Sequence, residues 1–332
     1  MTMPEASIIV PAFNVAATLQ ATLASLQAQT HGDFEIIIVL DGPRDETPRL
    51  AYEAAASDPR IRVIAQQNRG LAGARNTGIQ AAKGAYIGFC DADDLWLPHK
   101  LSTHVDHLAA NPNVGISYSA SAFIDDSGSL TGLAMRPRLT EITAAHVFRR
   151  NPIGNGSAPV IRRAVFDAIA WRPDHEAERD WCFDETFRQS EDIECWLRIA
   201  LTTDWAFEGV PEALTLYRVS AGALSADTTR QFAAWERMVT KLEPLAPGFF
   251  AAQTPAARAY QLRYLARRAV ADRRRDDAWR LAVRSLRQSL TPLMDEPRKT
   301  MTTLAAALAL RLAGPRLIDR AFALLSHSVR KA

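Results

Sequence analysis

Over residues 1–94, short apolar runs rich in β-branched side chains alternate with segments whose apolar residues recur at helical spacing. The runs lie at 7–10, 34–40, 60–65 and 85–90, and the helical segments at 15–26, 50–56 and 71–82. Strands that alternate with helices build parallel sheets with helices on both faces. The order therefore predicts an α/β fold with a doubly wound, mostly parallel sheet.

Polar side chains follow the predicted strands at the point where each strand ends. Asn14 and Asp41 follow the first two strands, and Asp91 and Asp93 follow the fourth. Ligands of open α/β sheets bind beyond the carboxyl ends of the strands. We therefore expect the binding site at this edge of the sheet.

Beyond Pro98 the pattern is less regular and then becomes helical. A strand at 114–124, a turn at 125–128 and a loop-rich stretch to Gly156 predict antiparallel additions to the sheet, and a helix is expected at 191–201. From about residue 226 the pattern predicts helices, at 257–272, 276–290, 299–312 and 315–330. The 332 residues thus divide into an α/β domain at 1–226 and a C-terminal all-helical module at 227–332.

Cysteine usage and hydropathy favour a cytoplasmic protein. Three cysteines without a CxxC pair form neither a disulfide framework nor a zinc site. The charge-free stretches at 6–30 and 300–310 are interrupted by polar residues or are shorter than the ~20 apolar residues that span a bilayer. We expect no membrane-spanning helix.

The net charge is +2, but basic and acidic residues are unevenly distributed along the chain. Residues 1–250 carry 22 basic against 31 acidic side chains, whereas residues 251–332 carry 17 against 6. A basic helical segment favours an anionic partner, either nucleic acid or a membrane surface. A solvated helical face that packs on the acidic part of the chain explains the same pattern.

The acidic turn DADD at 91–94 has two interpretations. Two aspartates one residue apart at a strand end suit Mg²⁺ or Mn²⁺ carrying a diphosphate, but Asp-rich turns are also commonly just solvated. His104 and His107 lie three apart on a predicted helix without a third ligand, so we interpret them as solvated. Cys90, in an apolar strand, is interpreted as a core residue.

Ordered motifs along residues 6–226 give this turn its context. They are SIIVPAFN at 7–14, IIIVLDG at 36–42, QNRGLAGARNTG at 67–78, DADDLW at 91–96, VIRR at 160–163, FDE at 183–185, SEDIECWLR at 190–198 and LYR at 216–218. Together they resemble the family 2 inverting glycosyltransferases of the GT-A fold, of the bacterial polysaccharide-assembly type. The resemblance implies a metal-dependent enzyme that moves a sugar from a nucleotide-diphosphate donor, expected to be a UDP-sugar, to an acceptor hydroxyl with inversion.

The resemblance also implies which residues form the donor site. Residues expected to bind the nucleotide sugar are Pro11, Ala12, Asn14, Asp41, Arg75, Asp91 and Arg218. Among them, Asp41 is expected to contact the base of the nucleotide, which is expected to be uracil. A further residue, Asp93, is expected to hold Mn²⁺ or Mg²⁺. A metal together with an arginine neutralises the charge of the departing diphosphate.

Asp192, in the Glu191-Asp192 pair, has the catalytic role in this interpretation. Inversion by direct displacement needs a carboxylate that takes the proton of the acceptor hydroxyl on the face opposite the diphosphate. In the family the aspartate of this pair has that role, and Glu191 is the competing base. The alternative is that Asp192 only caps a helix.

Two positions depart from the family pattern, and one element is absent. Leu40-Asp41 stands where many relatives have two aspartates, and Ser220 stands where relatives often have a histidine. A hydroxyl is a poorer metal ligand than an imidazole, so more of the metal binding falls to Asp93, diphosphate and water. The Gln-x-x-Arg-Trp element of processive members is absent, which predicts one sugar per acceptor.

Acceptors among relatives imply a glycan or a lipid-linked glycan as the partner. The basic segment is expected to contact the anionic inner face of a membrane rather than nucleic acid, because it has few aromatic residues for stacking on bases. Two rival functions are considered. A sugar nucleotidyltransferase requires a glycine-rich loop after the first strand, where this chain has VPAFN, and intact Asp93 and Asp192 disfavour an inactive sugar-nucleotide-binding protein.

Overall fold

A computed structural model describes residues 3–219 and 228–313, which form two compact units. The first takes its described residues from Met1–Val147 and Asn151–Ala223, and the second from Phe148–Arg150 and Leu224–Ala332. The helical unit thus includes a tripeptide from the middle of the α/β sequence. The predicted boundary at residue 226 lies outside the described residues.

The first unit is built on one nine-stranded sheet with the order β3-β2-β1-β4-β8-β6-β9-β5, with β7 paired to β6. One parallel part consists of β1 (Ala6–Ala12), β2 (Phe34–Asp41), β3 (Ile61–Gln66) and β4 (Tyr86–Phe89). The remaining strands are β5 (Leu95–Trp96), β6 (Val114–Ile124), β7 (Leu130–Met135), β8 (Val160–Arg162) and β9 (Ala206–Arg218). Antiparallel pairs join β4 to β8, β8 to β6, β6 to β7 and β9 to β5, which confirms the predicted additions.

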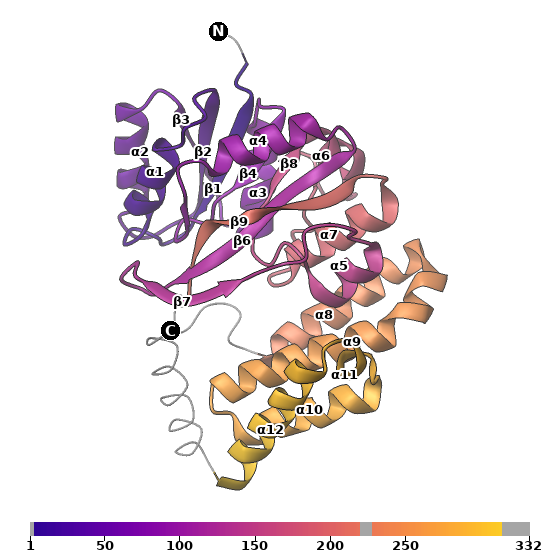
Figure 1. The fold of residues 1–332 in the computed structure, drawn as a ribbon. Coiled ribbons are helices and arrows are strands. Elements are labelled where there is room, and N and C mark those ends of the chain that lie inside the picture. The colour runs from indigo at the N-terminus through magenta and orange to yellow at the C-terminus, as the bar shows by residue number, and fades with distance from the viewer. Residues whose placement is uncertain (1–2, 220–227, 314–332) are drawn as a thin grey trace. The chain divides into compact units, whose positions relative to one another are not determined.

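Helices cover both faces of this sheet (Figure 1). They are α1 (Leu19–Gln27), α2 (Thr47–Ser57), α3 (Gly70–Ala81), α4 (Lys100–Ala110), α6 (Arg163–Ile169) and α7 (Glu191–Thr202), and α5 (Ala144–Arg150) is divided between the two units. Ile8 of β1 shares a core with α1, α2 and α4. Its neighbour Ile9 contacts α3 at Gly78, where a Cβ would come within 2.3 Å of the isoleucine Cγ2. Because β1 and β2 are buried on both faces, their sequences are largely apolar, with Ser7 in β1 and Glu35 and Asp41 in β2 as the polar exceptions.

The longest strand, β9, is absent from the sequence prediction. Gly209 and Pro211 interrupt its pattern, and both residues weaken a strand signal. The strand forms because β6 pairs with it in parallel along its length, with register shifts near Ser119 and Ala120 that accommodate the interruption. Long-range pairing therefore overrides the local sequence here.

The second unit is helical, as predicted. Its helices are α8 (Thr228–Leu242), α9 (Pro247–Ala271), α10 (Arg275–Gln288), α11 (Thr291–Asp295) and α12 (Pro297–Ala313), with a short 3₁₀ turn at Glu243–Leu245. Leu262, Leu265, Leu281 and Leu310 are among the residues of its core. Helix α9 begins ten residues before the predicted start at 257 and contains Pro255. The predicted helix at 315–330 lies outside the described residues.

Two further expectations concern the membrane and the cysteines. Among residues 3–219 and 228–313, no helix is both long and apolar enough to cross a membrane. Cys90, Cys182 and Cys195 are buried free thiols, so Cys90 is a core residue as predicted. Burial raises the pKa of the Cys90 thiol well above its ordinary value, which keeps it neutral.

Candidate active site

The acidic turn at 91–94 follows β4 and is fixed by Ser157. The Ser157 hydroxyl accepts a hydrogen bond from the Asp91 main-chain N–H at 2.9 Å and donates to Oδ2 of Asp94 at 2.6 Å. Within the turn, the Asp94 N–H donates to the Asp91 carbonyl at 2.9 Å. Asp94 is fully buried, and this burial raises its pKa well above the ordinary value. Asp94 therefore supports the turn, while Asp91 and Asp93 remain the candidate ligands.

Arg218, the last residue of β9, holds the same turn from the other side. Its main-chain N–H donates to Oδ1 of Asp94 at 2.9 Å, and its Nε donates to the Asp93 carbonyl at 2.8 Å. Its Nη1 donates to the carbonyls of Asp125 and Asp126 at 2.7 and 3.0 Å. The guanidinium is thus engaged with main-chain oxygens, which gives Arg218 a structural task in addition to the predicted donor contact.

Arg75 of α3 joins the acidic turn to the start of α7. Its Nη1 donates to Oε1 of Glu191 at 2.9 Å and its Nη2 to Oδ1 of Asp91 at 3.1 Å. The side chain is only 3% exposed. Gly156 leaves room for it, because a Cβ there would lie 2.1 Å from Nη2 of Arg75. Of the predicted site residues, Arg75, Asp91 and Glu191 are therefore in direct contact, with Asp192 next to Glu191.

The Glu191-Asp192 pair begins α7, and both carboxyls have raised pKa values. Burial and then the charge of Asp192 raise the pKa of Glu191 to about 7, against the opposing effect of Arg75. Burial also raises the pKa of Asp192, again opposed by Arg75. The preceding residue, Ser190, has a left-handed backbone with φ of 64°, a conformation that costs energy in a non-glycine residue. A strained backbone at Ser190 and two carboxyl groups with raised pKa values therefore occur together at the start of α7, as is common in active sites.

A loop before α7 is bonded to α3 by residues that the sequence analysis did not single out. Asn76 donates to the Phe183 carbonyl at 2.8 Å and accepts from the main-chain N–H groups of Cys182 and Phe183. Glu185 accepts from Arg69 and from Arg179, each at 2.7 Å. The only sequence signal was that Asn76, Arg69 and Glu185 lie within the family motifs. These contacts fix the position of α3 relative to the loop that leads into α7.

Asp41, the predicted base-reading residue, anchors the loop between β3 and α3. Its Oδ1 accepts from Nε2 of Gln66 at 2.7 Å and from the Arg69 main-chain N–H at 2.8 Å, and its Oδ2 accepts from the Gly70 N–H at 2.9 Å. Asp41 is buried at 3% exposure. The carboxylate thus fixes the start of the helix that carries Arg75.

Three predicted nucleotide-pocket residues lie at and beyond the end of β1. Pro11 and Ala12 are buried in the strand, parallel to Val39 and Leu40 of β2. Asn14 is exposed, has a left-handed φ of 54°, and accepts a hydrogen bond from the Arg44 N–H at 2.8 Å. The sheet thus brings this loop and the Asp41 loop to the same edge.

The chemistry of Asp91 and Asp93 fits a divalent cation. Burial and then the charge of Asp91 raise the pKa of Asp93 to about 6, and a cation beside the pair would offset both effects. The part of the chain that the structure describes contains no cluster of three or more His, Cys, Asp or Glu side chains with the geometry of a metal site. Any cation here would therefore rely on non-protein ligands as well.

The interpretation of His104 as solvated is wrong. His104 is fully buried, contacts the Ser117 hydroxyl at 2.7 Å, and lies 3.3 Å from Nζ of the buried Lys100. His107 is partly buried, shares Ser117 at 2.8 Å and lies 3.4 Å from Glu208. Because burial and the Lys100 charge lower the pKa of His104 well below its ordinary value, this histidine is a neutral member of a buried hydrogen-bonded network.

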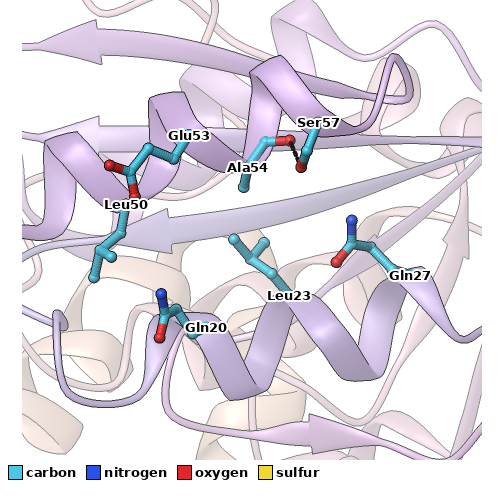
Figure 2. A pocket seen from close by; sticks show the side chains of 7 residues that line it. All are labelled: Gln20, Leu23, Gln27, Leu50, Glu53, Ala54 and Ser57. Atoms are coloured by element: carbon cyan, nitrogen blue, oxygen red, sulfur yellow. Dashed lines mark hydrogen bonds between the residues drawn. The ribbon is translucent and has the colours of Figure 1, made fainter.

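A surface groove between α1 and α2 contains none of the predicted site residues (Figure 2). It has a volume of about 330 Å³ and is lined by Gln20, Leu23, Gln27, Leu50, Glu53, Ala54 and Ser57. Its lining provides one carboxylate and no basic side chain. Nothing in this lining suits a diphosphate.

The mixed sheet, the helices on both of its faces and the carboxylates beyond its parallel strands define an α/β protein of the GT-A class. Residues 7–170 match the family model described as Glycosyl transferase family 2. The chain belongs to that family.

Curated relatives match parts of the chain. The uncharacterized glycosyltransferase EpsJ of Bacillus subtilis (strain 168) is 52% identical over 92 residues, which are 28% of this chain and 27% of EpsJ. The chondroitin synthase of Escherichia coli is 32% identical over 153 residues, 44% of this chain and 22% of the synthase. The matches thus span about a quarter of the length of these two relatives. The Escherichia coli glucosyltransferase WfgD is 27% identical over 226 residues, 68% of this chain and 81% of WfgD.

Solved structures share the fold over nearly the whole chain. Residues 1–349 of S. aureus TarS, in complex with UDP-GlcNAc, give a TM-score of 0.58 at 15% identity, covering 93% of this chain and 92% of TarS 1–349. The Pyrobaculum calidifontis mannosyltransferase PcManGT, in complex with GDP-Man and Mn²⁺, gives 0.53 at 19% identity, covering 94% of this chain and 88% of PcManGT. At these identities the likeness is one of fold.

Proposed function

We propose that the chain transfers one sugar at a time from a nucleotide-diphosphate donor to an acceptor hydroxyl with inversion. The observation that carries the proposal is the Arg75 guanidinium, which bonds Asp91 of the acidic turn and Glu191 of the Glu191-Asp192 pair in a chain of this family. A donor held at the acidic turn would then have its sugar near the carboxylate that must accept a proton.

Asp192 is the proposed general base. The acceptor oxygen attacks the anomeric carbon, the bond from that carbon to the diphosphate oxygen breaks, and the diphosphate leaves with the electron pair. The hydroxyl proton passes to the carboxylate of Asp192. A raised pKa suits this task, because proton transfer is most effective when the pKa of the base approaches the working pH.

Glu191 is proposed to position the base rather than to act as the base. Its Oε1 is already bonded to Arg75, and its side chain is buried. Asp192 is more exposed, and its Oδ1 accepts only a local hydrogen bond, from the Ile193 N–H at 2.8 Å, among the contacts of the described residues. The aspartate therefore has the freer carboxylate of the two.

We propose that Asp93 holds Mn²⁺ or Mg²⁺ together with the donor diphosphate. When bound, such an ion neutralises charge on the leaving diphosphate. The repulsion between Asp91 and Asp93, and the Mn²⁺ complex of the PcManGT fold relative, support this assignment. Ser220, where relatives often have a histidine, lies outside the described residues.

The donor proposed is a UDP-sugar. Support comes from the UDP-GlcNAc and UDP complexes of TarS and from WfgD, which is described as using UDP-Glc. Pro11, Ala12, Asn14 and Asp41 lie at the sheet edge where the nucleotide would bind. Asp41 contributes by ordering the Gln66–Gly70 loop, and Arg218 by ordering the acidic turn.

We propose a glycan or lipid-linked glycan acceptor in polysaccharide assembly, at the cytoplasmic face of a membrane. WfgD is described as transferring glucose to a diphosphoundecaprenol-linked sugar, and the basic helical unit would be attracted to an anionic leaflet. Truncation near Pro255 is unsuitable as a test of this placement, because it cuts α9 in two. Charge substitutions on the folded unit test it instead.

The experiment that tests the reaction measures nucleotide release. Purified full-length protein is incubated with UDP-Glc or UDP-GlcNAc, Mn²⁺ and a lipid extract as acceptor source, and free UDP is quantified beside the Asp192→Asn variant. Release that requires the extract and is lost in the variant supports the proposal. Donor binding without release identifies a sugar-nucleotide-binding protein, and pyrophosphate formation from UTP and a sugar phosphate identifies a nucleotidyltransferase.

A further inference from the structure

In the helical unit, a single carboxylate accepts three cationic side chains. Glu296, between α11 and α12, bonds Arg150 and Arg263 through Oε2 and Lys299 through Oε1, the last at 2.6 Å. All four residues belong to this unit. Burial acts to raise the pKa of Glu296, but the bonds from Lys299 and Arg263 hold it at about 2. Glu296 is therefore ionised at neutral pH, and its one negative charge is shared among the three cations.

Tyr260 fixes the two arginines in place. The guanidinium of Arg263 lies 5.0 Å from the centre of the tyrosine ring and that of Arg150 lies 5.6 Å from it. The tyrosine hydroxyl donates to Asp295 at 2.8 Å. Arg263 is buried and also donates to the Thr300 hydroxyl at 2.7 Å, whereas the Arg150 side chain remains 36% exposed.

Arg267 adds a fourth cation close to Arg263 and Arg150. It follows Arg263 by one turn of α9 and is solvent-exposed. Within 3–219 and 228–313, no hydrogen bond or ion pair joins its side chain to another residue. Loss of hydration and then the positive charges of Arg263 and Arg150 lower the pKa of Arg267. The negative charge of Glu296 opposes this effect, but that carboxylate is already bonded to Arg150, Arg263 and Lys299, so Arg267 shares its counter-charge with three other cations.

The charges of the cluster do not balance. Glu296 forms ion pairs with three cations, and Arg267 is a fourth cation close by. When Asp295 is counted as a second negative charge, the positive charges still outnumber the negative ones. Like charges held close together by packing and by an aromatic ring are stabilised when an anion binds between them. Guanidinium groups match the oxygens of a phosphate particularly well, because their donors form a planar fork.

We propose that Arg150 and Arg267, supported by Arg263, form a phosphate-binding site on the helical unit. The ligand is a phosphate ester, carried either by a lipid headgroup or by a soluble molecule. Met294 and Met301, which flank Glu296 and Lys299 in the sequence, are 78% and 56% exposed, and such apolar neighbours suit a lipid surface. This proposal does not rest on the proposed transfer reaction, because every residue in it lies in the second unit.

The test uses the full-length protein without donor or metal. One arm measures co-flotation with phosphatidylcholine vesicles with and without phosphatidic acid, and the other measures binding of glycerol 3-phosphate by calorimetry. Arg267→Ala is expected to weaken phosphate binding by about tenfold, since a charge-assisted contact is lost. Because this side chain makes no bond with a described residue, the variant should fold, and circular dichroism checks that it does.

Arg280→Ala is the matched control, because it removes the same charge from α10 and Arg280 is 69% exposed. We expect it to leave phosphate binding nearly unchanged, and Arg267→Lys to restore part of the affinity. Binding in the vesicle arm alone identifies a lipid headgroup as the source, and binding in both arms identifies a soluble phosphate ester. Equal losses in Arg267→Ala and Arg280→Ala, or no binding by the wild-type chain in either arm, would overturn the site and leave Glu296 as an internal ion-pair centre.

Discussion

Arg75 and Glu191 form an ion pair 2.9 Å long across a sequence separation of 116 residues. The same guanidinium bonds Asp91, so α3, the turn after β4 and the start of α7 meet at one side chain. Since Asp192 follows Glu191 directly, this contact also places the proposed base. The geometry of the site thus depends on how α3 is held as much as on the carboxylates themselves.

Arg75→Ala is expected to destabilise the protein by about 3 kcal/mol, because it leaves two carboxylates near a buried site without their cation. Urea denaturation at neutral pH measures this loss. Arg172→Ala, at an arginine that is 50% exposed and paired with Asp180, serves as the control and should change the free energy of unfolding by no more than about 0.5 kcal/mol. An Arg75→Ala protein as stable as this control would show that the bridge is dispensable for folding.

Asp192→Asn is expected to lower turnover by ~10²-fold or more while the affinity for the donor stays near that of the wild type. The substitution preserves shape and removes only the ability to take the acceptor proton. Initial rates at saturating acceptor, together with calorimetric donor binding, separate the two quantities. Wild-type turnover in this variant would make Asp192 a residue of the helix start only, and Glu191→Gln the next variant to measure.

The parallel half of the sheet was predictable because its strands and helices are local patterns with clear ends. Strand β6 was predicted at its observed bounds, Val114–Ile124, whereas β9 was missed because its pairing with β6 overrides Gly209 and Pro211. Local sequence also gives no sign that Phe148 belongs to the helical unit, where it stacks on Trp235 with ring centres 5.6 Å apart.

For the site, sequence motifs indicated which residues matter but not what each one contacts. Asp41 and Arg218 were predicted as ligand-binding residues, and the structure shows that they hold loops through main-chain hydrogen bonds. Those partners come from distant segments, so their identity follows only from the tertiary structure. The burial of His104 was missed for the same reason, since it depends on Ser117 of β6.

Asp93→Ala is expected to abolish the Mn²⁺ dependence of donor binding. Without donor and metal, the variant should be at least as stable as the wild type near pH 8, because it removes a desolvated carboxylate that is repelled by Asp91. Calorimetric titration of UDP with and without Mn²⁺, and urea denaturation, provide the two measurements. Unchanged Mn²⁺-dependent UDP binding would remove Asp93 from the proposed metal site.

Arg218→Ala is expected to differ from Asp93→Ala in its effect on stability. It frees the carbonyls of Asp93, Asp125 and Asp126 from a buried donor, so both the free energy of unfolding and Mn²⁺-dependent donor binding should fall. Arg218→Lys keeps the charge but lacks the fork of donors and should recover only part of the loss. A variant that loses donor binding at wild-type stability would instead indicate a direct contact between Arg218 and the donor.

Glu191 makes the stability of the free protein depend on pH. Its pKa is about 7 in the folded state, above the ordinary value of 4.5, so the folded state binds this proton more tightly than the unfolded state does. The resulting stabilisation is fully present below pH 4.5 and is lost as the pH rises through 7.

Between about pH 5 and pH 8, the free energy of unfolding of the wild type should therefore fall relative to that of Glu191→Gln, which has no proton to lose. Groups that do not interact with Glu191, such as His104, whose lowered pKa acts in the opposite direction, are present in both proteins and cancel in the difference. Urea denaturation at intervals of pH measures the two curves. If they run parallel, the Glu191 carboxyl titrates in its ordinary range and Arg75 compensates its burial completely.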